Sequence, residues 1–244
     1  MNIYFIRHAE STNNVVLYLR RPLEEHVCDP GLSDLGQRQA HALGGFLAEN
    51  IEEFNFNRIY ISPCLRTLQT AAAFTHLYPD APKIVWPDIH EYGGCAEIHP
   101  VTKARTGCPG MTRSEIKTQF PEYQLSEGVT DEGWYFLPGF EPREIGIARA
   151  KRVVQYLIDQ FGDSEEKIAI VSHWDFHILF ANTLLGLDDN THTRVVISNT
   201  GISTFAYAAD IWADSTEYWW SLVQINRCEW LTDDLQRDWS TLPN

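Results

Sequence analysis

The segment Ile3-Tyr4-Phe5-Ile6-Arg7-His8-Ala9-Glu10-Ser11-Thr12 decides the fold of this chain. Its short apolar run is typical of a buried strand, and the strand ends in an arginine and a histidine. Parallel strands of open α/β sheets end at the crevice that binds ligands, and a permanent cation beside an imidazole suits phosphate. Alternatively, Arg7 and His8 are solvated residues that start a loop, as most isolated pairs of this kind are. Other phosphate-binding groups elsewhere in the chain decide between these two interpretations.

Length and composition limit the possible classes of protein. The chain has 244 residues, of which 44% are hydrophobic, which is enough for one large α/β domain with an insertion. Against 33 acidic residues stand 19 lysines and arginines, and the net charge of -14 disfavours nonspecific binding to nucleic acid or to an anionic membrane. No apolar stretch approaches the roughly 18 residues of a membrane span, and Arg7 interrupts the first hydrophobic run. We therefore expect a cytoplasmic protein that binds neither nucleic acid nor membrane.

The five cysteines are odd in number and widely spaced, and no two form a C-x-x-C pair. This pattern favours reduced thiols over a disulfide framework or a zinc knuckle. Two other groupings have partial metal-site character: the i, i+4 pair His173 and His177, and the loop residues Cys95, His99 and Cys108. The first lacks the carboxylate pattern of a zinc hydrolase and the second lacks an obvious fourth ligand, so no metal is predicted.

Apolar strands alternate with amphipathic helices along most of the chain. Strands are predicted at 58–62, 83–86, 167–172, 194–198, 202–207 and 219–225, and helices from 33 to about 47, 64–78, 143–160 and 174–185. The last two strands are predicted to form an antiparallel hairpin. This order predicts a three-layer α/β/α sandwich with a mostly parallel sheet and antiparallel strands at one edge.

The segment from about 87 to 142 differs in composition from the rest of the chain. It is rich in Gly, Pro, Cys, Thr and charged residues, and Thr112-Arg113-Ser114-Glu115 has the pattern of a capping box at the start of a short helix. We interpret residues 1–244 as one domain in which this segment is an insertion over the site.

Polar groups of one chemical type follow four of the predicted strands. These groups are Arg7-His8, Ser62-Pro63 with Arg66, His90-Glu91, and Ser172-His173. Because parallel strands end at one edge of a sheet, two histidines, two arginines and a carboxylate are expected to converge there.

The same residues resemble the motifs of a known family. Arg7-His8-Ala9-Glu10-Ser11-x-x-Asn14 resembles R-H-G-E-T-x-x-N, Ser62-Pro63-x-x-Arg66-Thr67-x-Gln69-Thr70-Ala71 resembles S-P-x-x-R-x-x-Q-T-A, and Val171-Ser172-His173 resembles V-S-H. Leu32-Ser33-x-x-Gly36-x-x-Gln39-Ala40 is similar to the block between the first two. On these motifs the chain resembles the histidine phosphatase superfamily, of the phosphoglycerate-mutase-like branch 1 type.

The resemblance implies a covalent phosphoenzyme. His8 would be the nucleophile, Arg7 and Arg66 would clamp the phosphoryl group, and His173 would donate a hydrogen bond to its oxygens. Guanidinium groups bind phosphate oxygens in a bidentate manner, and nearby cations favour a neutral His8. Asn14 and the backbone amides that follow His8 are expected to add uncharged donors.

Glu91 is the candidate proton donor, because the family has a carboxylate after the third strand and an alkoxide leaving group needs a proton. We expect phosphate beside this carboxyl group to raise its pKa. Glu97 lies on the same loop and is an alternative, whereas His90 points the other way in an extended chain.

Substrate selection is assigned to the insertion and to Arg20, Arg21 and His26. The cationic loop residues Lys103, Arg105 and Arg113 are expected to be solvated more than to contact substrate. Two aromatic features have alternative roles: Trp174 narrows the pocket or packs in the core, and Trp134-Tyr135-Phe136 forms a lid or anchors its loop.

The reaction predicted from these residues is hydrolysis of a phosphoric monoester through a phosphohistidine, on a small phosphorylated metabolite, without metal or organic cofactor. A cofactor-dependent phosphoglycerate-type mutase is an alternative, which is weakened because Glu91-Tyr92-Gly93-Gly94 differs from the E-R-H-Y-G stretch of those mutases. A protein that binds phosphorylated ligands without turnover is the third hypothesis.

Overall fold

A seven-stranded sheet forms the centre of the computed structural model, which describes residues 1–189, 195–209 and 217–237. The strand order is β6-β3-β2-β7-β1-β8-β9. The strands are β1 (Asn2–Arg7), β2 (Arg58–Ile61), β3 (Lys83–Val85), β6 (Gln124–Leu125), β7 (Lys167–Ser172), β8 (Ile202–Ala209) and β9 (Tyr218–Arg227). The first five in this order run parallel, while β8 and β9 are antiparallel, which confirms the predicted sheet.

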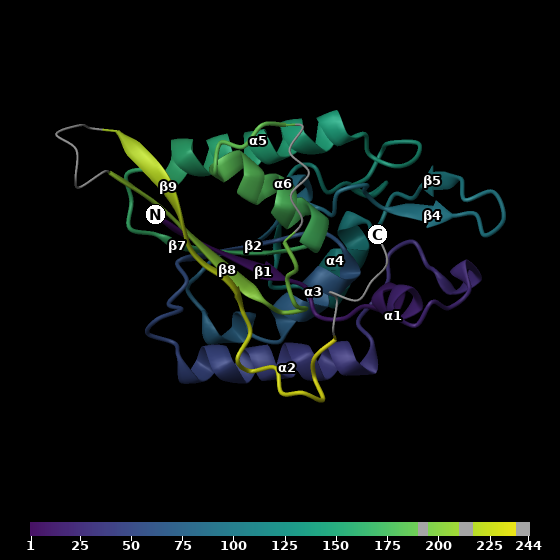
Figure 1. The fold of residues 1–244 in the computed structure, drawn as a ribbon, viewed down its shortest axis with the longest axis horizontal. Helices are drawn as coiled ribbons and strands as arrows, with labels where there is room; N and C mark the ends of the chain where they lie inside the picture. Colours follow the sequence, from purple (N-terminus) through teal and green to yellow (C-terminus); the bar gives the residue numbers. More distant parts are fainter. Residues whose placement is uncertain (190–194, 210–216, 238–244) are drawn as a thin grey trace.

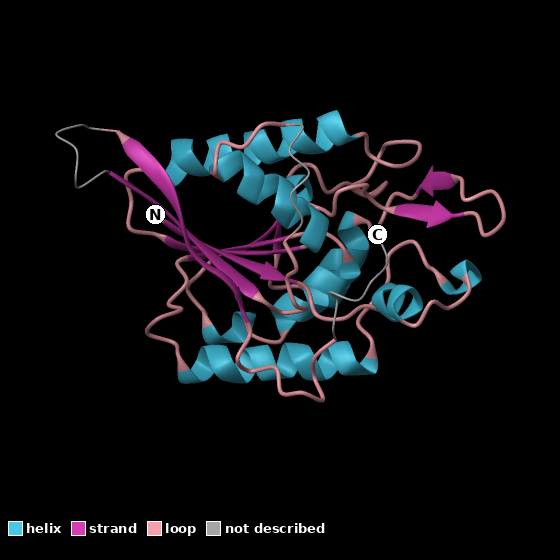
Figure 2. Ribbon diagram, in the orientation of Figure 1, coloured by secondary structure: helices cyan, strands magenta, loops and turns pink. Residues whose placement is uncertain are grey.

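Helices cover both faces of the sheet, as Figure 1 and Figure 2 show. The helices α2 (Asp34–Glu49) and α3 (Leu65–Ala72) lie on one face, and α5 (Arg143–Phe161) and α6 (Trp174–Leu184) lie on the other. The predicted three-layer α/β/α arrangement is therefore present.

The alternating side chains of the strands supply both halves of the core. Ile6, Ile61 and Val171 belong to the buried cluster beneath α2 and α3, and Phe5 and Ile170 belong to the cluster beneath α5 and α6. The central strands are thus apolar on both faces, as the continuous hydrophobic run at the start of the chain indicates.

The register of β1 and β7 brings the first and last motifs together. Arg7 pairs with Ser172 at the end of the parallel ladder, so His8 and His173 emerge side by side. Next to β7, the strand β2 ends at Ile61, directly before Ser62. The sequence motifs therefore meet at one edge of the sheet, for which the parallel strand direction is responsible.

Shorter elements extend beyond that edge (Figure 1). They are α1 (Thr12–Tyr18), the 3-10 turns at Leu23–Glu25 and Pro87–Ile89, and the hairpin of β4 (Ala96–Ile98) and β5 (Arg105–Gly107). The helix α4 (Arg113–Gln119) begins after the capping box at Thr112 that the sequence predicts. Because β6 also comes from residues 87–142 and pairs with β3, that segment contributes to the main sheet as well as to its surroundings.

Two predicted elements differ from the structure. The predicted helix at 64–78 ends at Ala72 and continues as the 3-10 turn Thr75–Leu77. Arg194 lies outside the described residues, and 195–198 form no strand. Among the described helices, none is long and apolar enough to cross a membrane.

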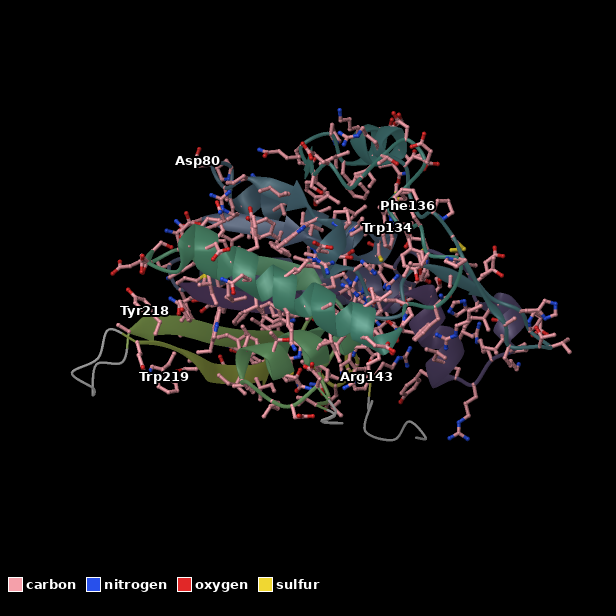
Figure 3. The ribbon with its side chains drawn as sticks, turned by 90° about the horizontal axis from the view of Figure 1, so that it is seen from above. Asp80, Trp134, Phe136, Arg143, Tyr218 and Trp219 are labelled. Carbon is pink, nitrogen blue, oxygen red and sulfur yellow. A yellow bond between two sulfur atoms is a disulfide. The ribbon has the colours of Figure 1, made fainter. Side chains whose placement is uncertain are left out.

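The strand β9 forms one edge of the sheet and is largely exposed. Figure 3 shows Tyr218 and Trp219 at the end of the molecule away from Trp134 and Phe136. Trp219 is 56% exposed and Val223 is 62% exposed, so β9 carries apolar side chains that are only partly covered by the described residues.

Candidate active site

A cavity of about 320 Å³ opens where β1, β2 and β7 end. The predicted site residues His8, Asn14, His26, Arg66 and Glu91 line it. Arg7 and His173 are buried directly behind them and do not line it.

His8 is held as a neutral imidazole whose Nε2 faces Arg66. Its Nδ1 lies 2.7 Å from the carbonyl oxygen of Ala9, so Nδ1 carries the proton and Nε2 carries the lone pair. Arg66 Nε donates to that Nε2 at 3.3 Å. Burial, and then the charges of Arg66 and Arg7, lower the pKa of His8 well below its ordinary value. The ring is therefore neutral at pH 7, which is the form in which an imidazole can act as a nucleophile.

His173 has the opposite tautomer. Arg66 Nη2 donates to its Nδ1 at 3.1 Å, and since a guanidinium only donates, the His173 proton is on Nε2, which lies 2.7 Å from Ser62 Oγ. The two imidazole centroids are 5.1 Å apart. In this state His173 presents an acceptor to Arg66 rather than the donor to phosphate that the resemblance implies.

Arg66 occupies the position between the two imidazoles because α3 begins there. Asp29 Oδ1 accepts a hydrogen bond from the backbone amide of Leu65 at 3.0 Å, at the start of α3. The same carboxylate oxygen lies 3.8 Å from Arg66 Nη1. Asp29 thus fixes both the helix start and the guanidinium, a role that sequence reasoning missed.

Arg7 is directed away from the cavity. Its Nη1 donates to the carbonyl of Ile197, and its guanidinium carbon lies 4.9 Å from the ring centroid of Trp174. Trp174 Nε1 donates to the Val195 carbonyl at 2.5 Å. Burial lowers the pKa of Arg7 to about 10, so it stays charged at neutral pH. Trp174 is partly buried beside Arg7 and does not line the cavity, which favours packing over narrowing of the pocket.

Glu91 is suited to donate a proton. Its Oε1 accepts hydrogen bonds from the backbone amides of Tyr92 at 2.9 Å and Phe176 at 3.0 Å. Burial, and next the charge of Asp175, raise the pKa of Glu91 to about 7. A carboxyl group with this pKa holds a proton for much of the time near neutrality, which general acid catalysis requires. Asp175 also lines the cavity and was missed, although its position in the first turn of α6 was a usable signal.

The uncharged donors differ from expectation. Asn14 lines the cavity, and its Oδ1 accepts from the backbone amide of Ser11 at 3.1 Å. The amides after His8 are already used: Ala9 donates to Thr70 Oγ1 and Glu10 to Gln39 Oε1. The prediction that these amides bind an anion is wrong, because the turn after β1 uses them to hold α2 and α3.

The two arginines predicted to select the substrate do not lie in the cavity wall. Arg20 and Arg21 do not line the cavity; Arg20 is exposed at a positive φ of 51°, and Arg21 pairs with Glu25 on the surface at 3.3 Å. Arg105 is exposed, as expected for a cationic loop residue, and it also lines the cavity, whereas Lys103 and Arg113 do not line it. The path of each loop decides which arginines line the cavity. The periodicity of helices and strands carries no information about that path.

The remaining sequence candidates lie around the cavity. His90 is buried with Nδ1 2.6 Å from the Pro87 carbonyl, and neither it nor Glu97 lines the cavity. Trp134 and Tyr135 are each 5% exposed and anchor their loop, while Phe136 is 64% exposed (Figure 3). His177 is buried against Phe5, with ring centroids 4.7 Å apart.

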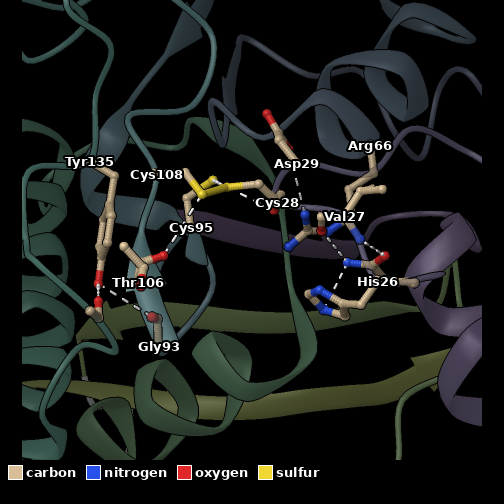
Figure 4. The surroundings of a disulfide bond; sticks show 12 residues. His26, Val27, Cys28, Asp29, Arg66, Gly93, Cys95, Thr106, Cys108 and Tyr135 are labelled. Atoms are coloured by element: carbon tan, nitrogen blue, oxygen red, sulfur yellow. Dashed lines mark hydrogen bonds and ion pairs between the residues drawn. A yellow bond between two sulfur atoms is a disulfide. The ribbon is translucent and has the colours of Figure 1, made fainter. Parts of the chain in front are cut away.

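A disulfide joins Cys28 to Cys108, which corrects the prediction of reduced thiols (Figure 4). The two cysteines are separated by 80 residues, so neither spacing nor cysteine number could indicate the pair. The thiol of Cys95 lies 3.3 Å from Cys28 Sγ. Cys108 is thereby removed from the grouping with Cys95 and His99 that had partial metal-site character.

Glu10, within the first motif, supports the site rather than entering it. It is fully buried, and its carboxylate accepts from Ser33 Oγ and from Arg237 Nε, each at 2.7 Å. The carboxylate therefore connects the turn after β1 to α2 and to the C-terminal segment.

Comparison with known families identifies the class of protein that carries this fold and these motifs. Residues 3–215 match the histidine phosphatase superfamily (branch 1), and the chain belongs to that superfamily.

Relatives are known from sequence and from structure. The chain is 27% identical over 173 residues to 6-phosphofructo-2-kinase/fructose-2,6-bisphosphatase of Aquarana catesbeiana, an alignment that covers 70% of this chain and 30% of the relative. It is 34% identical over 89 residues to the PE-PGRS family protein PE_PGRS11 of Mycobacterium tuberculosis, covering 36% and 14%. The chain thus spans less than a third of the length of these curated relatives.

Solved structures share the fold. The mycobacterial glucosyl-3-phosphoglycerate phosphatase has a TM-score of 0.58 at 20% identity, with 92% of this chain and 98% of that chain covered. The phosphoserine phosphatase of Entamoeba histolytica has a TM-score of 0.56 at 20% identity, with 95% and 99% covered. At this identity the similarity establishes the phosphoglycerate-mutase-like fold.

Proposed function

We propose that this protein hydrolyses the phosphoric monoester of a small metabolite through a phosphohistidine at His8. The observation that carries the proposal is that one cavity holds an unprotonated candidate nucleophile, His8, and a candidate proton donor, Glu91. His8 is neutral with its proton on Nδ1 and its lone pair on Nε2, and Glu91 has a pKa of about 7. Nucleophile and proton donor are therefore both ready at the same pH.

The proposed reaction has two displacements. In the first, His8 Nε2 attacks phosphorus, the bond from phosphorus to the ester oxygen breaks, and that oxygen takes the proton of Glu91. In the second, water attacks the phosphohistidine and gives a proton to the Glu91 carboxylate. Phosphate leaves, and His8 is regenerated with its lone pair.

Arg66 must change partners for the attack to occur, because its Nε now donates to the Nε2 lone pair. A bound phosphate dianion offers better acceptors, so the guanidinium would turn to the phosphate oxygens and release His8. Released from Arg66, His173 would move its proton to Nδ1 while the Ser62 hydroxyl donates to Nε2. His173 would then donate to phosphate, and Arg7 would add a fixed positive charge behind it.

The proposed substrate is a small phosphate ester, in keeping with the acidic net charge of the chain and its cationic cavity. The mechanism uses no metal ion and no organic cofactor. The cytoplasmic location predicted from the sequence is retained in the proposal, although the Cys28–Cys108 disulfide is the feature that argues against it.

The test is His8→Ala, with the exposed His41→Ala as a matched control. His8→Ala should abolish phosphate release and acid-labile labelling by a ³²P-labelled substrate, while His41→Ala should keep both. Substantial hydrolysis by His8→Ala would refute the mechanism. A mutase would instead move phosphate within phosphoglycerate and respond to a bisphosphorylated sugar acid, and a binding protein would release no phosphate from an aryl phosphate.

A further inference from the structure

A second cationic group lies in the cavity, on an element that the reaction proposed above does not use. Arg105 starts β5 and is paired with Ile98 of β4, and both side chains line the cavity. The Arg105 guanidinium carbon lies 4.2 Å from the ring centroid of Phe140. Contact with this ring restricts the guanidinium, and because the Arg105 side chain is exposed it keeps N–H groups available to a ligand.

Arg105 has no carboxylate partner among the residues that the structure describes. Other arginines among the described residues do pair with a carboxylate. They include Arg21, Arg38, Arg58, Arg149, Arg152, Arg227 and Arg237. In a chain with a net charge of -14, a cavity cation left without a carboxylate is suited to an anionic ligand.

His26 contributes a second donor whose tautomer the structure fixes. The Asn13 side chain accepts from the Val27 amide at 3.0 Å and donates to the Val27 carbonyl at 2.7 Å, which sets the orientation of its amide group. The same Asn13 nitrogen lies 2.9 Å from His26 Nε2, so Nε2 is an acceptor and Nδ1 carries the proton. That Nδ1–H is buried and has no hydrogen-bond partner among the described residues, so a ligand group must approach it closely to accept from it.

The charges of Arg105 and Arg66 also reach His26. After burial, they are the causes that lower its pKa, so His26 is neutral and lies in the positive field of these two arginines. An anionic group near His26 would meet that field, and Arg66 belongs to the phosphate-binding end of the cavity. Arg66, His26 and Arg105 line one and the same cavity.

A covalent bond holds the two walls of this region together. Cys28 follows His26 by two residues, and Cys108 follows Arg105 by three, so the disulfide ties the His26 loop to the β4–β5 hairpin (Figure 4). The amide of Gly107 donates to the Pro138 carbonyl at 2.9 Å, which anchors the hairpin on its other side. Arg105 and His26 are thus held in place before a ligand binds, which lowers the entropic cost of binding.

We propose that Arg105 and His26 form a subsite for a second anionic group, a carboxylate or a phosphate, on the phosphomonoester. Arg105 is then a residue that determines specificity. The proposal rests on the phosphatase function proposed above and narrows its substrates to esters that carry two anionic groups.

The experiment compares two esters that differ in the second charge, 3-phosphoglycerate and glycerol 3-phosphate. A ratio of their kcat/KM values removes any general loss of activity or folding. Wild-type enzyme should prefer 3-phosphoglycerate, and Arg105→Gln should lower that ratio by roughly 10- to 100-fold, the usual effect of one charge-assisted hydrogen bond. Lys103→Gln removes the same charge from the same hairpin outside the cavity, and it should leave the ratio unchanged.

A second arm compares glucose 1,6-bisphosphate with glucose 6-phosphate, so that it separates a second phosphate from a carboxylate. Selectivity for one pair identifies the group that the subsite takes. If wild-type enzyme shows no preference within either pair, or if Lys103→Gln matches Arg105→Gln, the subsite proposal is overturned. Failure of the phosphatase proposal is a different result: either wild-type enzyme would release phosphate from none of the four esters, or His8→Ala would still hydrolyse them.

Discussion

Replacing Glu91 by Gln tests two consequences of its buried environment, one for catalysis and one for the stability of the fold. The change keeps the shape of the side chain and keeps an oxygen that can accept from the Tyr92 and Phe176 amides. It removes the proton that the leaving group needs, and it removes the buried charge. Catalysis and stability are therefore expected to respond in opposite directions.

The loss of activity should depend on the leaving group. With an alkyl phosphate, whose alkoxide needs a proton, Glu91→Gln should lower kcat roughly 100- to 10,000-fold. With p-nitrophenyl phosphate, which expels a stable phenolate, the loss should be less than about tenfold. In wild-type enzyme, activity on the alkyl ester should fall as pH rises above about 7, because the Glu91 carboxyl then loses its proton.

The stability effect follows from the same pKa. Below pH 4.5 the carboxyl group is protonated in both the folded and the unfolded protein, so it imposes no cost. Between pH 4.5 and about 7 only the unfolded chain ionises, and above that range the folded protein carries the full penalty. At 1.36 kcal/mol per pH unit, the difference between the unfolded and folded pKa values of Glu91 corresponds to about 3 kcal/mol.

Urea unfolding of Glu91→Gln and wild type should therefore give equal stabilities near pH 4 and a variant that is more stable by up to about 3 kcal/mol near pH 8. Two results would refute the reasoning. One is a pair of stability curves that stay parallel across this pH range. The other is an equal loss of kcat on the alkyl and the aryl phosphate, which would show that Glu91 does not protonate the leaving group.

Three further predictions concern the scaffold. Gly36→Ala should cost more than about 3 kcal/mol in urea unfolding, because a Cβ there would lie 2.0 Å from the Glu10 carbonyl oxygen, whereas Gly45→Ala, with nothing within 4 Å, should be neutral or stabilising. Cys108→Ser should lower stability by up to about 4 kcal/mol and match reduced wild type in thermal unfolding, while Cys228→Ser should not; equal Tm values with and without reductant would contradict this. Burial lowers the pKa of His177 from 6.5 to about 3, so wild type should lose stability as pH falls below 6.5 and His177→Leu should lose less, which unfolding curves at pH 7 and pH 4.5 would compare.

The motifs at the strand ends could be predicted because each depends on local signals. Apolar runs mark β1 and β7, and side-chain caps at Ser33 and Thr112 mark the starts of α2 and α4. Once the sheet is parallel, the positions of His8 and His173 follow from topology. The sequence therefore predicts the centre of the candidate site well.

The errors concern features that depend on contacts between distant segments. The Cys28–Cys108 bond and the place of Arg105 in the cavity wall each require the path of a loop through space. The spacing of apolar residues along the sequence carries no information about such a path. Arg105 was expected to be solvated because cationic loop residues usually are, yet it lines the cavity from the β4–β5 hairpin, whereas Arg20 and Arg21 do not line it.

The parallel pairing of β1 and β7 affects the order in which the protein loses its properties on heating. Because Arg7 is in register with Ser172 in the middle of the sheet, the spacing of the two imidazoles persists for as long as that ladder does. The β4–β5 hairpin is a two-stranded sheet of its own, held by one disulfide and by contacts with its neighbours. As temperature rises, the protein should first become indiscriminate among esters and only afterwards inactive.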